Sequence, residues 1–169
     1  MKILVFSDSH SGLRCMRLAM DRICPDAVIH LGDYVGDAQT IAEEYPGTRF
    51  YMVAGNCDRY RVPPDFPETL VETIRGVRVY MTHGHIQHVK TDLGMLLYNA
   101  RRCGVQVALY GHTHCPDCRQ LEDGLWVMNP GSCGYFGGSA GVIELSDGII
   151  ETCKIVREED LFTTSSSET

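Results

Sequence analysis

The 169-residue sequence contains no apolar run that approaches the ~20 residues of a membrane-spanning helix. Its apolar start, residues 3–6, is too short for a signal-peptide core, and no cleavage pattern follows it. Basic residues are also few, since 15 lysines and arginines stand against 22 acidic residues, for a net charge of −7. Such a surface repels a phosphate backbone, and no stretch interleaves basic and aromatic residues. We therefore expect a cytoplasmic protein that crosses no membrane, and the sequence disfavours a nuclease or any binding of a nucleic-acid polymer.

Signals for a disulfide framework or a structural zinc site are missing as well. There are eight cysteines, but nothing suggests secretion, and a chain of this length buries a core without covalent links. Cys115 and Cys118 have the spacing of a redox or zinc pair, yet no second Cys-x-x-Cys exists to complete a zinc site. We interpret all eight as reduced thiols, with Cys115 and Cys118 in a loop beside the functional site.

What the sequence does contain is an alternation of apolar strands and helical segments. Strands are expected over residues 2–6, 27–31, 50–53, 77–81 and 107–110, and helices over 13–23, 38–44 and 91–103. This alternation predicts a parallel sheet with right-handed crossovers. Later strands at 125–128, 142–145 and 149–155 have no helices between them, which indicates a second sheet packed on the first. We expect one domain over residues 1–156 and a tail over 157–169 whose last residues are disordered.

Five of the expected strands end in residue types that bind metals. Because ligands bind at the carboxyl ends of strands in open α/β sheets, these side chains should converge. Carboxylate, imidazole and amide ligands together suit divalent ions such as Mn, Fe, Co, Ni or Zn. The five motifs are Asp8-Ser9-His10, Gly32-Asp33, Gly55-Asn56-Cys57-Asp58, Thr82-His83-Gly84-His85 and Gly111-His112-Thr113-His114.

Each motif alone is a weak signal, because Gly-Asp is common in turns and a lone histidine is more often a structural residue than a ligand. Five of the seven histidines lie in these motifs, however, each just beyond an expected strand. A structural cluster without metal remains the alternative, and it explains this recurrence poorly.

In their order and strand context, the motifs resemble those of the calcineurin-like metallophosphoesterase family. Asn129-Pro130-Gly131-Ser132 also looks like a motif of the family's small single-domain phosphodiesterases from bacteria and archaea. The resemblance implies a two-sheet β-sandwich flanked by helices on both outer faces, a four-layer α/β/β/α fold.

The resemblance also implies two divalent metal ions, with Asp33 bridging them. We expect manganese first, with Ni, Fe, Co, Zn or Mg left open. The resemblance assigns Asp8, His10, Asp33 and His114 to one ion, and Asp33, Asn56, His83 and His112 to the other.

The function expected from this ligand set is hydrolysis of a small phosphate ester, a phosphodiester most of all. A metal-bound hydroxide would attack in line, with Asp33 and Asn56 acting as ligands in the catalytic centre. Many relatives carry a histidine after the asparagine, thought to assist the leaving group, but this chain has Cys57, and a thiol is a poor donor. His85 is a candidate substitute for that catalytic histidine, and a role in supporting the loop is equally open.

Several alternatives stay open. The retromer subunit that shares this fold is regarded as mainly an interaction protein, so a non-catalytic metal-binding scaffold is the second hypothesis. A homo-oligomer is also left open. Specificity is expected from the surface loop at residues 59–67 and from aromatic residues such as Tyr34, Tyr135 and Phe136.

Overall fold

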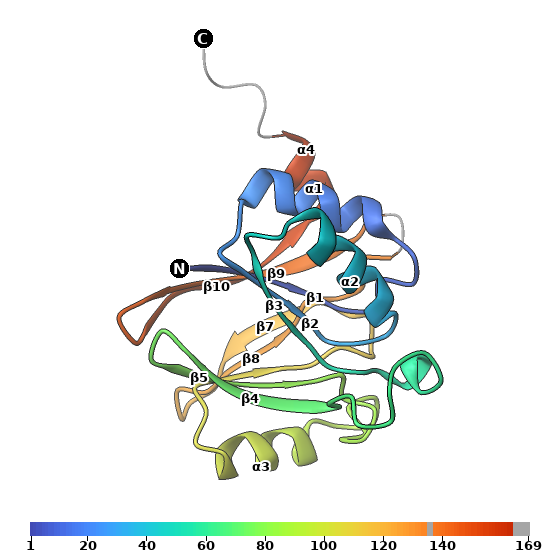
Figure 1. Ribbon diagram of the computed structural model, residues 1–169. Helices are drawn as coiled ribbons and strands as arrows, with labels where there is room; N and C mark the ends of the chain where they lie inside the picture. Colours follow the sequence, from blue (N-terminus) through green and yellow to red (C-terminus); the bar gives the residue numbers. More distant parts are fainter. Residues whose placement is uncertain (135–136, 164–169) are drawn as a thin grey trace.

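Two five-stranded sheets lie face to face, and helices cover both outer faces (Figure 1). The computed structural model describes residues 1–134 and 137–163. This arrangement confirms the four-layer α/β/β/α sandwich expected from the sequence. Tyr135, Phe136 and the end of the expected disordered tail, residues 164–169, lie outside the described residues.

The first sheet has the order β10-β9-β1-β2-β3, and its three early strands are parallel. Helices α1 and α2 connect these strands and cover the outer face of the sheet, while β9 pairs antiparallel with β1. The elements are β1 (Lys2–Phe6), α1 (Leu13–Ile23), β2 (Ala27–His30), α2 (Val35–Glu44), β3 (Arg49–Met52), β9 (Ser139–Ser146) and β10 (Ile149–Arg157).

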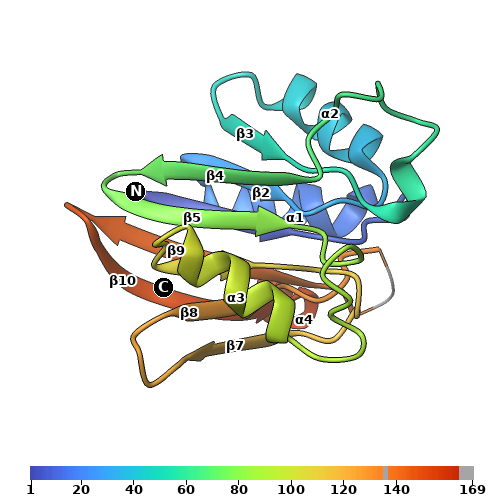
Figure 2. The same cartoon turned by 90° about the horizontal axis from the view of Figure 1, so that it is seen from below.

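The second sheet has the order β4-β5-β6-β8-β7, with β5, β6 and β8 parallel. Helix α3 crosses its outer face, as the view from below shows (Figure 2). The elements are β4 (Thr69–Ile74), β5 (Val77–Thr82), α3 (Gly94–Arg102), β6 (Val107–Leu109), β7 (Asp117–Gln120) and β8 (Trp126–Asn129).

The apolar runs that predicted the strands fill three interior layers. In β1, Ile3 and Val5 face the other sheet, whereas Leu4 and Phe6 face α1 and α2. A third cluster packs Leu96 of α3 against the second sheet. Because both faces of β1 are buried, its sequence is a continuous apolar run rather than an alternating one. The buried strands form a rigid frame whose carboxyl ends carry the polar motifs.

Two strands were not expected from the sequence. Strand β4 forms a hairpin with β5 across the Arg75-Gly76 turn, and its residues are only half-buried. Strand β7 lies where a loop was expected, because Asp117–Gln120 has no apolar pattern and pairs with β8 as an edge strand. An edge strand that packs little apolar surface leaves little trace in the sequence.

Helix boundaries differ from the expected ones, and one helix was not expected. Helix α2 begins at Val35 rather than at residue 38. Helix α3 begins at Gly94 rather than at residue 91, since the Asp92 carboxylate accepts from the Gly94 N–H at 2.6 Å. A short helix, α4 (Glu158–Thr163), follows β10 and buries Leu161 against the cluster that includes α1. The packed body thus extends beyond residue 156. None of the helices in the described residues is long and apolar enough to cross a membrane.

Candidate metal centre

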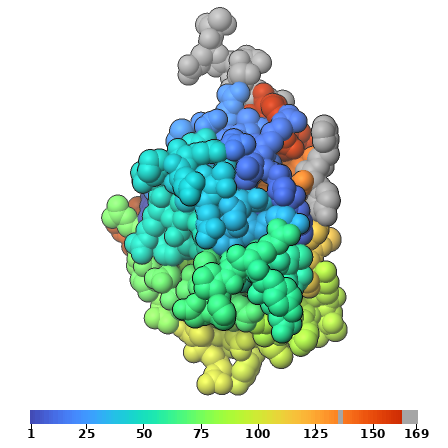
Figure 3. All heavy atoms as spheres, turned by 45° about the vertical axis from the view of Figure 1, so that its right-hand side comes forward, coloured from blue at the N-terminus to red at the C-terminus, as the bar shows by residue number. Residues whose placement is uncertain are grey.

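The five motifs meet at one end of the sandwich, at the carboxyl ends of parallel strands. In Figure 3 this end is turned toward the viewer, and the blue, cyan and green segments that carry the first three motifs adjoin one another. Asp8 and His10 follow β1, Asp33 follows β2, and Asn56 opens the 3-10 helix η1 (Asn56–Asp58) after β3. From the second sheet, the remaining motifs follow β5 and β6. The predicted convergence is therefore present in the fold.

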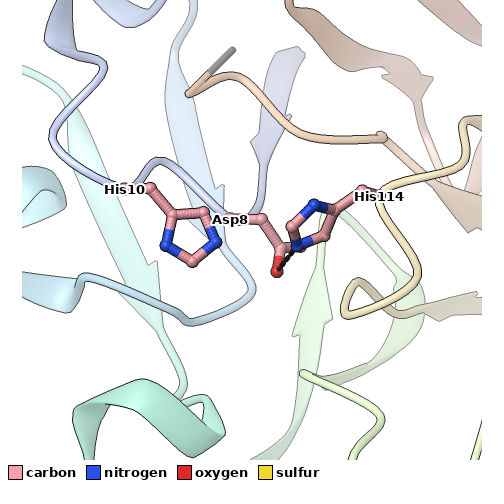
Figure 4. A group of neighbouring side chains, drawn as sticks. All are labelled: Asp8, His10 and His114. Carbon is pink, nitrogen blue, oxygen red and sulfur yellow. Dashed lines mark ion pairs between the residues drawn. The ribbon is translucent and has the colours of Figure 1, made fainter.

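Two groups of side chains lie close enough to hold metal ions. The first is Asp8, His10 and His114, whose ligand atoms lie within 4.8 Å of one another. In Figure 4 the Asp8 carboxylate lies between the two imidazoles, and its Oδ1 is 3.1 Å from His114 Nε2. The second group is Asp8, Asp33 and His83. Asp8 is thus the carboxylate common to both groups.

Asn56 and His112 complete the side of the cage around His83. The Nε2 atom of His83 lies 3.1 Å from Asn56 Oδ1 and 3.2 Å from His112 Nδ1. The same atom is 3.5 Å from Asp33 Oδ1. All seven side chains that the resemblance names as ligands therefore lie in one continuous cluster.

The chemistry of this donor set fits divalent ions. His83 Nδ1 lies 2.8 Å from the carbonyl oxygen of Leu31, which only accepts, so Nδ1 carries a proton and the metal-binding form of the ring has its lone pair on Nε2. That lone pair faces the oxygens of Asn56 and Asp33. Buried Oδ1 of Asp8 also receives no hydrogen bond from the described residues. Lone pairs that face one another in this way repel unless a cation lies between them.

The ionisation of two cluster members also favours metal binding. Burial, the neighbouring His83 and Lys90 lower the pKa of His112 to about 4, so its ring is neutral at pH 7 and offers a lone pair. Burial opposes ionisation of Asp33, but His83 and the Cys57 N–H outweigh it and hold the pKa of that carboxyl below its usual value. Both side chains are thus in the state that binds cations.

The backbone at the ligands is strained. Eleven non-glycine residues of the described chain have positive φ, and five of them are the predicted ligands Asp8, His10, Asp33, His112 and His114. A left-handed conformation is sparsely populated by such residues and costs of order 1 kcal/mol or more each. This strain was not predicted from the residue types, and it concentrates at the predicted ligands.

Two glycines allow the ligand loops to approach one another. A Cβ on Gly111 would overlap the Ser7 hydroxyl and come within 2.9 Å of Asp8 Oδ2. A Cβ on Gly55 would overlap the Asp33 carboxylate. These positions need glycine for space.

Three hydrogen bonds orient Asp8, and one of their donors, Ser7, was not singled out from the sequence. Oδ2 of Asp8 accepts hydrogen bonds from the Ser7 hydroxyl at 2.6 Å and from the His112 N–H at 3.0 Å. Its carbonyl oxygen accepts from the Ser132 hydroxyl at 2.7 Å. These bonds leave Oδ1 directed at the imidazoles, which is the support that metal ligands require.

Asp58 joins the second and third motifs. Its Oδ1 accepts from the N–H groups of Tyr34 and Val35 at 2.9 Å each, and its Oδ2 accepts from the Gly55 N–H at 2.9 Å. The carboxylate is fully buried. The sequence left open whether Asp58 orients a ligand or caps a turn; it caps the start of α2 and fixes the loops that carry Asp33 and Asn56.

His30 received no role from the sequence, although it lies under the same loops. It is fully buried, its Nδ1 accepts from the Gly32 N–H at 3.3 Å, and its Nε2 lies 3.2 Å from the Ser9 hydroxyl. Burial lowers its pKa to about 4. The sequence signal that could have indicated a buried supporting role is a histidine at the end of an otherwise apolar strand.

Asn129 shapes the last ligand loop, as expected. Its Nδ2 donates to the Gly111 carbonyl at 3.0 Å and to the Thr113 hydroxyl at 2.9 Å, and its Oδ1 accepts from the Gly131 N–H at 2.9 Å.

His85 lies at the edge of the cluster rather than inside it. Its ring centroid is 5.4 Å from that of His83, and its Nε2 is 3.8 Å from a Glu68 carboxylate oxygen. Burial and His83 lower the pKa of His85, and Glu68 works in the opposite direction. Cys57 faces the site from the other side: burial and the Asp33 carboxylate raise its pKa to about 11, so the thiol is protonated at neutral pH.

The loop at residues 59–67 borders a cleft of about 390 Å³ next to Gly55 and Glu68. Its wall combines the apolar side chains of Val62 and Phe66 with charged groups at the rim. Arg61 lies outside this lining, with its guanidinium 4.3 Å from the Tyr34 ring centroid. The expected loop is therefore present and adjoins the ligand cluster.

Fold and site together define a metal-dependent phosphoesterase. A family model described as the calcineurin-like phosphoesterase superfamily domain matches residues 1–147. The chain belongs to the calcineurin-like phosphoesterase superfamily, which makes it a hydrolase of phosphoric esters, as the sequence predicted, and implies divalent metal ions.

Similar proteins agree with this assignment. A probable metallophosphoesterase of Bacillus subtilis is 31% identical over 133 residues, which cover 78% of this chain and 75% of the relative. A phosphodiesterase of Methanocaldococcus jannaschii is 30% identical over 172 residues, covering 91% of this chain and 95% of the relative. Zinc-bound Vps29 of Entamoeba histolytica matches with a TM-score of 0.71 and 22% identity over 94% of this chain and 99% of its own, a likeness that concerns the fold alone.

Proposed function

We propose that the chain is a phosphodiesterase with a dinuclear metal centre, acting on a small phosphodiester. The observation that carries this proposal is the convergence of two overlapping ligand groups, which share the Asp8 carboxylate. The relative from Methanocaldococcus jannaschii is named a phosphodiesterase, which supports the same reaction class. We further propose manganese as the ion, because the ligands are imidazole, carboxylate and amide.

The role of the bound ions would be to lower the pKa of a water molecule and to neutralise charge on the phosphoryl group. The chain's own residues prepare this chemistry. The Nε2 atom of His83 lies 3.1 Å from Asn56 Oδ1, 3.5 Å from Asp33 Oδ1 and 3.9 Å from Asp8 Oδ1, so this ring joins the ligands of both proposed ions. Asp8 and Asp33 serve as ligands, and no side chain has to act as a covalent nucleophile.

Leaving-group chemistry is the weaker part of the centre. Cys57 is protonated but is a poor hydrogen-bond donor, and its Sγ already lies 3.3 Å from Asn56 Nδ2. We propose His85 as the group that assists departure, since it borders the cluster and its Nδ1 has no hydrogen-bond partner in the described residues. Because Cys57 replaces the histidine that many relatives carry and His85 lies only at the edge of the cluster, assistance should be incomplete, and esters with good leaving groups should be strongly preferred.

The cleft beside the loop at residues 59–67 is the proposed place for one arm of the diester. Phe66 and Val62 provide apolar surface, and Glu68 connects the cleft to His85. Of the charged lining residues, Arg59 is opposed by Asp65 and Glu68, so the cleft favours an uncharged arm such as a nucleoside or aryl group over a second phosphate. Phe66→Ala should raise KM for diesters with a bulky arm and leave metal content unchanged; an unchanged KM would contradict this placement.

The reaction is tested by hydrolysis of bis(4-nitrophenyl) phosphate by the full chain, loaded with Mn²⁺ after chelation. We expect turnover that disappears on chelation, and much slower hydrolysis of a dialkyl phosphate. A fully loaded protein that is inactive with every divalent ion tried would favour the scaffold alternative. Equal rates on aryl and alkyl esters would contradict the proposed weakness in leaving-group assistance.

Three further expectations remain part of this proposal. We place the chain in the cytoplasm on the ground of its reduced thiols, and treat residues 1–156 with α4 as one domain. A homo-oligomer stays open.

A further inference from the structure

Two cysteines meet across the sandwich, away from the metal centre. Cys118 lies in β7 and Cys153 in β10, which are the edge strands of the two different sheets. Their sulfur atoms are 3.5 Å apart, and the Cys118 thiol also lies 3.3 Å from the Cys153 carbonyl oxygen as a donor. The two residues are 35 positions apart in the chain, so the contact is a product of the fold.

The other six cysteines form no such pair. In the described residues, Cys118 and Cys153 are the one pair of thiols in hydrogen-bond contact. Cys115, which shares the Cys-x-x-Cys motif with Cys118, is exposed, and its N–H donates to the Thr113 hydroxyl instead. Cys133 is buried in apolar surroundings that raise its pKa far above the usual value. The fold thus pairs Cys118 with Cys153 rather than with its neighbour in the motif.

Small reagents can reach the pair. A cleft of about 420 Å³ opens beside the two sulfurs, with Pro116, Lys154 and Arg157 among its lining residues. Asp117 and Asp160 line the same cleft, so its basic and acidic side chains balance. The two sulfurs share one hydrogen bond, and this contact lowers the pKa of Cys118 and, together with burial, raises the pKa of Cys153. Once one thiol is oxidised, the other lies 3.5 Å away and can attack it.

We propose that Cys118 and Cys153 form a peroxide-oxidisable thiol pair whose disulfide joins the edges of the two sheets. The Cys118 thiolate attacks one oxygen of hydrogen peroxide, giving a sulfenic acid and hydroxide, which takes up the proton that Cys118 released. The Cys153 thiol then attacks the sulfenic sulfur, and its proton leaves with the hydroxyl group as a second water. Two thiols lose two electrons, one peroxide becomes two waters, and a dithiol reverses the oxidation.

The bond would act on both the stability and the site. Closing a loop of this length restricts the unfolded chain, and β7 begins three residues after the predicted ligand His114. The disulfide therefore fixes the strand that follows the last ligand loop. We expect the oxidised protein to melt higher than the reduced protein by roughly 5–10 °C, on the scale of disulfide effects in domains of this size.

The test treats the full chain with hydrogen peroxide and maps its peptides without reduction. The expected product is about 2 Da lighter, links the peptides of Cys118 and Cys153, and returns to the starting mass with dithiothreitol. Cys115→Ser should oxidise in the same way, whereas Cys118→Ser and Cys153→Ser should not. Their reduced forms should melt within a few degrees of the parent, which separates loss of the link from loss of folding.

Three results would overturn the proposal. One is a link between Cys115 and Cys118, another is conversion of Cys118 to sulfinic acid without a link, and the third is a link that leaves the melting temperature unchanged. All three readouts are independent of phosphoesterase activity.

Discussion

The two ends of the sandwich use the same unusual backbone conformation in different ways. At the hairpin end, Arg75-Gly76 and Asp147-Gly148 each place two successive residues at positive φ, and the two turns meet through a hydrogen bond from Gly148 N–H to Arg75 at 2.9 Å. At the metal end, left-handed residues are mostly aspartate and histidine. Two successive residues at positive φ form the turn that two-residue hairpins favour. The positive φ values of the aspartates and histidines at the metal end are not required by any such turn.

The difference teaches where the strain is held. In a hairpin turn, glycine adopts positive φ with little strain, and the turn is complete within four residues. Asp33, by contrast, is held in place by the hydrogen bond that the Tyr34 N–H of its loop donates to Asp58 and by the bond that the Cys57 N–H donates to the Asp33 carboxylate at 2.8 Å. Backbone strain that only tertiary contacts maintain is expected at functional sites. Changes at the metal end should therefore have much larger effects than matched changes at the hairpin end.

The largest effect is expected for Asp33→Asn, with Asp147→Asn as its matched control. Both residues have positive φ, at 56° and 46°, and asparagine tolerates that conformation. We expect Asp33→Asn to lose metal from both positions and at least about 100-fold in rate, because a ligand charge is removed. Asp147→Asn should keep both.

Metal content and diesterase rate, measured on the same samples, test whether Asp33 is a ligand of both ions. Asp8→Asn, made in parallel, separates the roles of the two carboxylates, since Asp8 is the member common to both groups in the structure. Loss of one ion with Asp33→Asn and of two with Asp8→Asn would transfer the bridging role to Asp8.

A large loss of stability is expected for Asp58→Ala. Three buried N–H groups would lose their acceptor, at about 1–3 kcal/mol each before relaxation, so we expect at least about 3 kcal/mol. Asp123→Ala removes an exposed carboxylate that pairs with Arg101 and should leave the denaturation midpoint nearly unchanged. Urea denaturation of metal-free protein is the measurement. Similar midpoints for the two variants would show that the metal end is not held by Asp58.

Acid should weaken the metal end through His30. The folded protein holds the pKa of this ring at about 4, below its ordinary value of 6.5, so the unfolded chain binds the proton first as the pH falls. The contribution of a neutral His30 is full above pH 6.5 and is lost as the pH falls toward 4, by up to about 3 kcal/mol. His30→Gln does not titrate at this position.

The difference in unfolding free energy between the parent and His30→Gln, measured without metal, should therefore shrink as the pH falls from 7 to 4.5. A difference that stays constant with pH would mean that His30 is not the titrating group.

Much of the site was predictable because its signal is local. Each ligand directly follows a buried strand, so an apolar run and the polar residues after it are visible in the sequence. The same reasoning found that there are two sheets, but it assigned some strands wrongly. Strands β9 and β10 were expected in the second sheet, yet β9 pairs with β1 and both belong to the first sheet. The ligand assignment beyond this clustering remains a prediction.

What the sequence could not show depends on long-range contacts. Strand β7 exists because β8 pairs with it, and the contact of Cys118 with Cys153 requires both sheets to be placed. Likewise, the roles of Asp58, Ser7 and His30 come from loops that meet only after folding. A buried polar side chain is recognisable as a support only when its partners are known.

The smallest effect is expected from replacing two glycines that do not have positive φ. The pair compares a crowded position at the metal end with an open one in a helix. Gly111 leaves no room for a Cβ beside Ser7 and Asp8, whereas Gly36 in α2 has no atom within 4 Å of such a Cβ. Gly111→Ala should cost about 1–3 kcal/mol through overpacking and should weaken metal binding, because Asp8 must move. Gly36→Ala should stabilise by up to about 1 kcal/mol, since alanine favours the helix. Denaturation and metal titration of both variants measure these effects, and the two changes in stability should have opposite signs. If Gly111→Ala kept both stability and metal affinity, the close approach of the loops would not be what orients Asp8.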